Sequence, residues 1–133
     1  MWRSTNLSQV DNLQHNISKA QGLASIIETL FENYISPTAI MDRDFNFIKV
    51  NKAYAQTDNR EPDYFIGRNH FDLYPSVYES IFKQVVKTKK TYYAYAQPFI
   101  YEFNTERGIS YWYWTLSPLL DEKGEVFLLI LSL

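Results

Sequence analysis

The sequence predicts an α+β fold, in which a five-stranded antiparallel sheet carries helices on one face and follows a long N-terminal amphipathic helix. Three observations lead to this prediction. Residues 8–34 repeat apolar side chains at alternating intervals of three and four, the period of a helix with one apolar stripe. Five later runs are rich in β-branched and aromatic residues, and short polar turns join them in two groups. Because short links between paired strands require antiparallel pairing, the runs form one sheet with helices packed on it.

Composition narrows the class of molecule and excludes several kinds of site. A length of 133 residues suits one core, and aromatic residues make up 17% of the chain, which favours a densely packed core, an interface or a pocket for a flat ligand. The net charge of −2 gives no electrostatic support for binding to nucleic acid or to an anionic membrane. Because the chain has no cysteine, disulfides and thiolate metal sites are excluded.

The sequence shows no membrane anchor and no secretion signal. Its longest apolar run, Val126 to Leu131, is too short to cross a bilayer. The first residues, Met1 to Asn6, lack the apolar core of a signal peptide. We therefore expect a cytoplasmic protein, with no membrane contact by this segment.

The predicted N-terminal helix starts near Ser8 and ends before Pro37, which cannot continue a helix. Its apolar stripe keeps a heptad spacing for more than three repeats, which favours pairing with the same helix of a second copy. The alternative is a single amphipathic helix folded onto its own core. We assign residues 1–35 to a linker and dimerisation helix. Its seam residues are Val10, Leu13, Ile17, Ala20, Ala24 and Ile27.

The first two strands are predicted as a hairpin. Thr38–Met41 and Phe47–Val50 are the apolar runs, and residues 42–46 between them have the composition of a turn. Asn51 has the side chain of a helix N-cap, which predicts a short helix through Gln56.

Two further helices are predicted before the last strands. Pro62 can open a short helix that Gly67 closes. Ser76 and Glu79 have the spacing of a capping box, which predicts the start of a longer helix. The apolar positions of this longer helix are Tyr78, Ile81, Phe82 and Val85.

Three strands are predicted to complete the sheet. They cover residues 92–101, 109–119 and 125–133. The two connections between them end in Gly108 and Gly124, which suit the left-handed position of a hairpin turn. The chain therefore ends in a three-stranded antiparallel meander.

Six short motifs occur in a fixed order over the last three quarters of the chain. They are Ser36–Asp42, Val50–Tyr54, Phe65–Asn69, Phe71–Pro75, Leu116–Leu119 and Asp121–Val126. Each is weakly specific alone, but the ordered set resembles the PAS domain, a sensory input domain of bacterial and archaeal signalling proteins such as sensor histidine kinases. We therefore assign residues 36–133 to a PAS-like sensory domain.

The resemblance implies how the two faces of the sheet are used. One face lines an internal pocket, and the other contacts a flanking helix or a second subunit. We therefore expect a homodimer through the N-terminal helix and the sheet face. The resemblance also implies an effector domain in the same parent chain, either a histidine kinase or a transcriptional regulator, and this segment is not expected to bind nucleic acid.

The resemblance suggests two cofactors, and the residues argue against both. A flavin photoadduct needs a cysteine after Gly67-Arg68-Asn69, where this chain has His70. The positions that would hold the flavin ring carry Trp112 and Leu133, which cannot make those hydrogen bonds. Haem-binding members take their axial histidine from the long helix, and residues 77–90 contain none. No cofactor is therefore expected, and a single histidine without clustered carboxylates or thiols predicts no metal site.

A small organic ligand or a core filled by aromatic side chains remains. Strand alternation places both indoles of the strand 109–119 on one face, which points inward by the resemblance. The candidate pocket residues are Phe65, His70, Trp112, Trp114 and Leu116. His70 would add a polar group whose charge changes near neutral pH. In the alternative interpretation the indoles fill the pocket, and the domain is a ligand-free scaffold for protein interaction.

Catalysis has little support in the sequence. No nucleophile–base pair, glycine-rich phosphate loop or metal cluster occurs. Small α+β domains with a conical sheet include isomerases in which a carboxylate faces an apolar pocket, but Asp42, Asp58 and Asp72 lie in turn-like contexts. The prediction is therefore a signal-sensing and dimerisation module that is not an enzyme, and an isomerase-like enzyme is kept as a third hypothesis.

Overall fold

A computed structural model describes residues 4–100 and 108–133 of the protein, with side chains described for residues 7–95 and 113–133. The chain divides into two compact units, Met1–Asn33 and Tyr34–Leu133. The first unit is a helix, and the second contains the sheet with its covering helices. The functional division into residues 1–35 and 36–133 remains a prediction.

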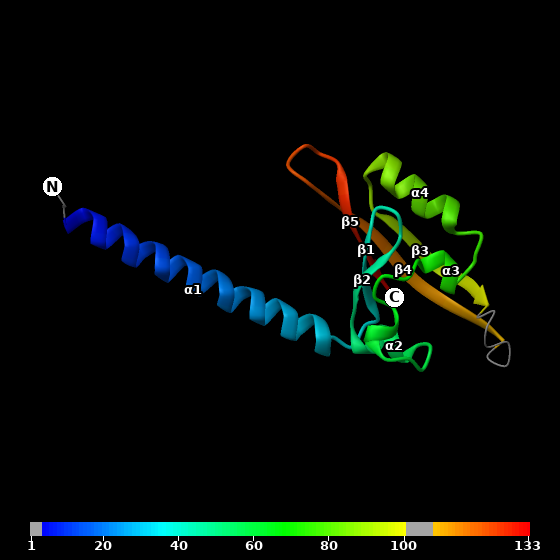
Figure 1. Ribbon diagram of the computed structural model, residues 1–133. Helices are drawn as coiled ribbons and strands as arrows, with labels where there is room; N and C mark the ends of the chain where they lie inside the picture. Colours follow the sequence, from blue (N-terminus) through cyan, green and yellow to red (C-terminus); the bar gives the residue numbers. More distant parts are fainter. Residues whose placement is uncertain (1–3, 101–107) are drawn as a thin grey trace. The chain divides into compact units, whose positions relative to one another are not determined.

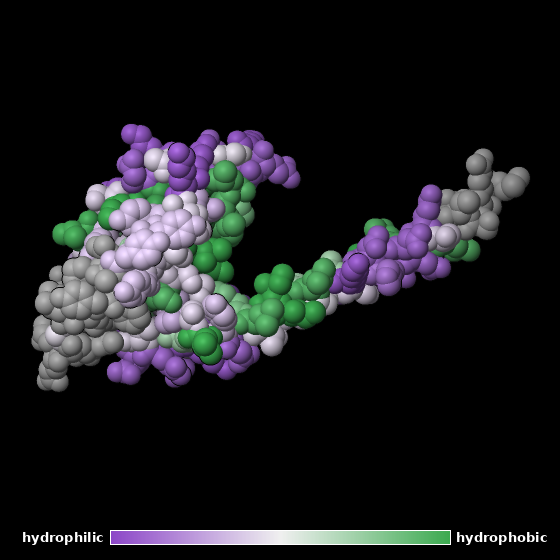
Figure 2. Space-filling view, turned by 180° about the vertical axis from the view of Figure 1, so that it is seen from behind, coloured by the Kyte–Doolittle hydropathy of each residue, from purple (hydrophilic) through white to green (hydrophobic). Residues whose placement is uncertain are grey.

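The first unit contains α1 (Ser4–Asn33), which begins earlier than the predicted start at Ser8. Its apolar side chains concentrate in the C-terminal half of the helix (Figure 2). Within the described part of the chain, no helix is both long and apolar enough to cross a membrane. The large apolar residues of the C-terminal half include Leu23, Ile26, Ile27 and Leu30.

The second unit is built on one five-stranded antiparallel sheet, as predicted (Figure 1). Its order is β2-β1-β5-β4-β3, so that the last strand lies between the first and the fourth. The sheet therefore depends on pairing between distant parts of the chain, from Thr38 opposite Ser132 to Asp42 opposite Leu128. The strands are β1 (Thr38–Asp42), β2 (Phe47–Val50), β3 (Tyr92–Ile100), β4 (Ile109–Leu120) and β5 (Val126–Ser132).

Four short helices connect β2 to β3 and cover one face of the sheet. Phe82 and Val85 are buried, and the Phe82 ring lies 5.7 Å from the Trp114 ring on β4, between centroids. Tyr54 likewise lies 5.7 Å from the ring of Phe47 on β2. The helices thus form one wall of the core and the sheet forms the other. They are α2 (Lys52–Gln56), the 3-10 helix η1 (Pro62–Tyr64), α3 (His70–Leu73) and α4 (Glu79–Thr88).

The predicted starts of the first two covering helices are confirmed. Asn51 caps α2 through a hydrogen bond from the N–H of Tyr54, and Pro62 is the first residue of η1. The helix η1 stops at Tyr64 and not, as was predicted, at Gly67. Gly67 instead has a left-handed conformation (φ 81°) in the turn before α3. The sequence did not predict α3.

The capping box predicted for Ser76 and Glu79 is wrong. Residues 77–78 form a turn, so α4 begins only at Glu79, after a residue that makes no side-chain cap. The Ser76 hydroxyl instead accepts a hydrogen bond from the N–H of Tyr78, at 3.2 Å. Glu79 forms an ion pair with Lys83 one turn later, at 3.1 Å.

The glycines predicted at the hairpin connections have the expected left-handed backbone. Gly108 has a φ of 68° and Gly124 a φ of 79°. Asp121 completes the second turn, because its Oδ1 accepts hydrogen bonds from the N–H groups of Lys123 (2.8 Å) and Glu125 (3.0 Å). Residues 105–107 of the first connection lie outside the described residues.

Asn51 is buried, with 1% of its surface exposed, and its side-chain amide joins three segments. Oδ1 accepts hydrogen bonds from the N–H groups of Thr38 (3.0 Å) and Tyr54 (2.9 Å). Nδ2 donates to the carbonyl of Ser36 at 2.9 Å and to that of Tyr34 at 3.4 Å. One side chain thereby fixes the first residues of the unit, the start of β1 and the start of α2.

Replacing Asn51 by alanine is expected to lower the free energy of unfolding by about 2–4 kcal/mol, because it removes an N-cap and leaves two buried N–H groups unpaired. Chemical denaturation followed by circular dichroism measures this change. Asn33→Ala is the matched control, since that side chain bonds only the Thr29 carbonyl on an exposed helix surface. We expect a change below about 0.5 kcal/mol for the control, and equal losses in both variants would contradict the role of Asn51.

Candidate functional site

The inward face of β4 carries two of the predicted pocket residues, Trp114 and Leu116. Trp114 is 7% exposed and Leu116 is fully buried, whereas Tyr113, next to Trp114, is 66% exposed. The predicted alternation of this strand is therefore confirmed over these residues. Trp112 lies on β4 opposite Gln97, but its side chain lies outside the described residues.

His70 and Phe65 join Trp114 in one cluster of rings. The His70 ring contacts Phe71 (4.6 Å between centroids), Phe82 (5.1 Å) and Phe47 (5.6 Å). Phe82 continues the cluster to Trp114, and Phe47 continues it to Phe65 at 5.3 Å. Three of the candidate pocket residues, Phe65, His70 and Trp114, are thus linked through the rings of Phe47 and Phe82. We call the following group the aromatic cluster: Phe47, Phe65, His70, Phe71, Phe82 and Trp114.

His70 is the polar member of the aromatic cluster. Its side chain is buried, and its Nδ1 has no hydrogen-bond partner among the described residues. Burial lowers the pKa of His70 from 6.5 to about 3, because the apolar surroundings disfavour the imidazolium. The expectation that its charge changes near neutral pH is therefore wrong. His70 is therefore a neutral ring in the core, and one of its nitrogens is buried without a hydrogen bond among the described residues.

The outward face of the sheet is apolar as well, although one face of an antiparallel sheet is commonly solvated. Tyr93 and Tyr95 are 62% and 71% exposed, so both side chains of β3 lie on this outward face. Tyr95 and Tyr113 pack edge to face, with 6.3 Å between ring centroids. A shallow hollow of about 230 Å³ lies on this face. It is lined by Tyr93, Ala94, Tyr95, Tyr113, Trp114, Thr115, Ser132 and Leu133.

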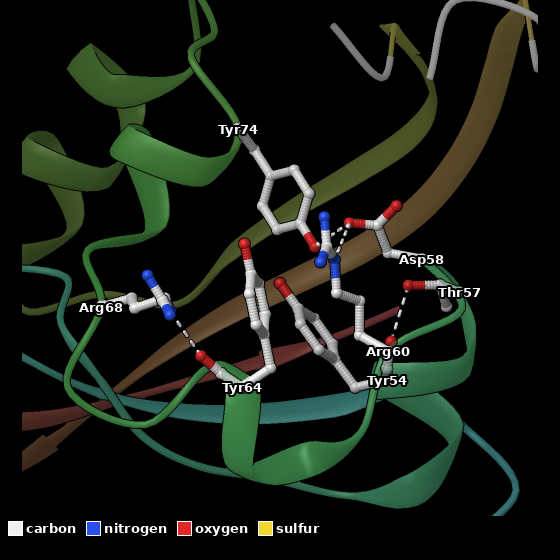
Figure 3. Close-up of polar contacts among 7 residues, drawn as sticks. All are labelled: Tyr54, Thr57, Asp58, Arg60, Tyr64, Arg68 and Tyr74. Carbon is white, nitrogen blue, oxygen red and sulfur yellow. Dashed lines mark hydrogen bonds and ion pairs between the residues drawn. The ribbon is translucent and has the colours of Figure 1, made fainter. Parts of the chain in front are cut away.

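A polar group lies around η1 and α3 and connects to the aromatic cluster (Figure 3). The Tyr74 hydroxyl donates a hydrogen bond to Oδ2 of Asp58 at 3.0 Å, and the Tyr74 ring lies 5.5 Å from the ring of His70. The same carboxylate oxygen lies 3.9 Å from Nε of Arg60. The sequence did not predict this group, because its members become neighbours only through the fold.

The other two acidic residues named in the sequence, Asp42 and Asp72, lie at a turn and in a short helix. Asp42 Oδ1 accepts hydrogen bonds from the N–H groups of Asp44 (2.9 Å) and Asn46 (3.0 Å), which closes the β1–β2 turn. Asp72 lies in the first turn of α3. The described residues contain no group of three or more His, Asp or Glu side chains that could hold a metal ion.

The six predicted seam residues all lie on α1. The alternating spacing of three and four keeps them along one side of the helix. Four of them, Val10, Leu13, Ile17 and Ile27, expose 49–66% of their surface. Ala20 and Ala24 continue the stripe between them. Pairing of this stripe with a second copy remains a prediction.

Because the folded state resists protonation of His70, the pH dependence of stability tests its environment. Between pH 6.5 and about 3 the unfolded chain binds a proton at this position and the folded chain does not. The free energy of unfolding should therefore fall as the pH drops below 6.5, by up to about 1.4 kcal/mol per pH unit from this group. Urea denaturation of the wild type and of His70→Phe, from neutral pH to about pH 5, measures the difference.

The variant should lose this part of the slope, whereas the control His15→Gln on α1 should keep it. Identical slopes in the wild type and His70→Phe would show that His70 accepts a proton in the folded state.

Comparison with known proteins agrees with this architecture. A family model described as the PAS fold matches residues 31–133. No curated relative matches the chain significantly. Among solved structures, the PAS domain of nitrogen regulation protein NR(II) from Vibrio parahaemolyticus is similar with a TM-score of 0.63 at 13% identity, over 78% of this chain and 92% of that one.

Two further structures have the same fold. The sensory box sensor histidine kinase from Vibrio cholerae gives a TM-score of 0.59 at 15% identity, over 89% of this chain and 94% of that one. VqmA bound to DPO gives 0.62 at 21% identity, over 83% of this chain and 56% of that one, so the match spans about half of VqmA. PAS domains are generally non-catalytic sensory modules. With its five-stranded sheet and a family match from residue 31 to its last residue, the chain belongs to the PAS fold family.

Proposed function

We propose that this chain is the signal-input module of a larger cytoplasmic signalling protein and that it senses a small organic ligand in its aromatic core. The observation that carries this proposal is the buried His70, whose Nδ1 has no hydrogen-bond partner among the described residues. A buried polar atom without a partner is costly, and a bound ligand can supply the missing bond. The parent protein would carry a histidine kinase or a transcriptional regulator as its effector.

The surroundings of His70 restrict the chemistry of this ligand. The desolvation that keeps His70 neutral also disfavours a charged guest. Phe47, Phe82 and Trp114 offer ring faces and edges, which suit a flat, partly aromatic molecule. We therefore expect a small neutral compound with one hydrogen-bonding group directed at His70. The similar VqmA, solved bound to DPO, supports small-molecule binding in this fold.

A ligand-free scaffold is the second candidate function. Phe65 and Leu116 have no exposed surface, and the rings of the aromatic cluster already contact one another. A core that is filled by its own side chains needs no guest. In this case the domain would only dimerise and hold its effector in place.

Both candidate functions include dimerisation. Tyr93, Tyr95 and Tyr113 expose large aromatic surfaces on the outer face of the sheet, around a shallow hollow. Contiguous exposed apolar surface of this kind marks an interaction site. Together with the seam of α1, it supports a homodimer in which helix and sheet face both contact a second copy.

Native mass spectrometry of the purified protein tests the ligand. We expect a bound small molecule on the wild type, and about tenfold lower occupancy on His70→Phe, which fills similar space but lacks the nitrogen. The control His15→Gln removes a histidine from α1 and should leave occupancy unchanged. Equal occupancy in the wild type and His70→Phe would place the ligand elsewhere, and a bare wild type would favour the scaffold.

The seam is tested by placing a charge in it. Ile17→Glu should convert a dimer into a monomer in sedimentation velocity, because the carboxylate would be buried without a partner between two helices. Ser18→Glu adds the same charge beside the seam and should remain dimeric. A wild-type monomer, or a dimer that survives Ile17→Glu, would contradict pairing through α1.

A further inference from the structure

Tyr74 lies at the inner end of a polar route that leads from His70 to the solvent. Of the four rings that contact His70 in the described part of the chain, three are phenylalanines and only Tyr74 carries a polar atom. Exposure rises outward along this route. It is 8% for Tyr74, 17% for the Asp58 side chain and 41% for the Arg60 side chain. The Tyr74 ring therefore separates the buried imidazole from the polar surface around Asp58.

The hydroxyl of Tyr74 joins two of the covering helices. Tyr74 directly follows α3 and Asp58 lies just after α2, and their hydrogen bond of 3.0 Å crosses from one to the other (Figure 3). The acceptor is a carboxylate oxygen, and hydrogen bonds to charged acceptors are stronger than those to neutral ones. The bond therefore holds the Tyr74 ring against His70, with 5.5 Å between the ring centroids.

The segment around Tyr74 is short and irregular. The helix before it, α3, has four residues, and so short a helix has little stability of its own. The helix after it begins only at Glu79, and Val77 in between is 82% exposed. Segments with little buried surface open locally at low cost in free energy. The Tyr74 ring can therefore turn away from His70 without unfolding of the sheet, once its bond to Asp58 is broken.

We propose that Tyr74 is a gate residue for His70 and that the Tyr74–Asp58 bond keeps this gate closed. Access to Nδ1 of His70 requires such a movement, because this atom is buried. When the bond breaks, the ring turns toward the surface and a small neutral molecule reaches the imidazole. That a ligand uses this route rests on the proposed function, whereas the opening of the gate does not.

Chemical modification of His70 measures the opening without any ligand. Diethyl pyrocarbonate acylates accessible neutral imidazoles, and trypsin separates the two histidines of the chain into the peptides 4–19 and 69–83. Mass spectrometry of these peptides follows His70, and the exposed His15 on α1 is the internal reference for the activity of the reagent.

We expect slow modification of His70 in the wild type and a rate about tenfold higher in Tyr74→Phe, which keeps the ring and loses the bond. Asp58→Ala should give a similar increase, and the double variant should add nothing further, because both changes remove the same bond. Tyr93→Phe removes an exposed hydroxyl from β3 and is the matched control, with an unchanged rate.

Two results would overturn the gate. One is an equal rate of His70 modification in the wild type and in Tyr74→Phe. The other is a rate that rises steeply at low urea concentrations, because the reagent would then reach His70 only through global unfolding.

The gate and the ligand can fail separately. A bare wild type in native mass spectrometry, together with faster modification of Tyr74→Phe, would support the gate and contradict the ligand. A bound molecule, together with equal modification rates, would support the ligand and contradict the gate.

Discussion

Asn51 buries a primary amide at the point where the chain enters the sheet domain. Such a group can be buried only when its donors and acceptors find partners. Here the partners come from the segment before β1, from β1 itself and from α2. The N–H of Leu133 donates to the carbonyl of Pro37 at 2.8 Å, which brings the end of β5 to the same corner. The segment that enters the sheet and the strand that ends the chain are thus tied to one buried side chain and its neighbours.

The aromatic cluster is stabilised by ring contacts, whereas Asn51 is stabilised by hydrogen bonds. Each well-placed ring pair contributes about 0.5–1.5 kcal/mol beyond the area it buries, and His70 makes several such contacts. An unpaired buried nitrogen costs about 1–3 kcal/mol, so the ring contacts can offset it. Phenylalanine at this position would keep the contacts without that cost. The nitrogen therefore contributes nothing to the packing of the aromatic cluster, and the proposed function assigns it the binding of a ligand.

Elements with strong local signals could be predicted from the sequence, and those that depend on tertiary contacts could not. Runs of β-branched and aromatic residues between polar turns identified the strands, and Asn51 as an N-cap identified α2. The start of α4 was predicted wrongly, because the favourable spacing of Ser76 and Glu79 does not reveal the turn between them. The Asp58–Tyr74 bond and the contacts of Arg60 and Arg68 with the Tyr64 ring depend on how α2, η1 and α3 fold together. No local periodicity encodes such neighbours.

In the proposed function, the two faces of β4 connect a ligand bound in the core to a second copy of the chain. Trp114 points into the aromatic cluster, and the adjacent Tyr113 points to the outer face, so a strand shift that makes room beside Trp114 also moves Tyr113. The ladder with β3 has a bulge at this point, where the register shifts between Ala94 and Gln97. A bulge leaves one residue unpaired, disrupts the ladder locally and increases the local twist of the strand. In the proposed function, the sheet itself therefore carries the signal, because consecutive residues of one strand face the ligand and the second copy.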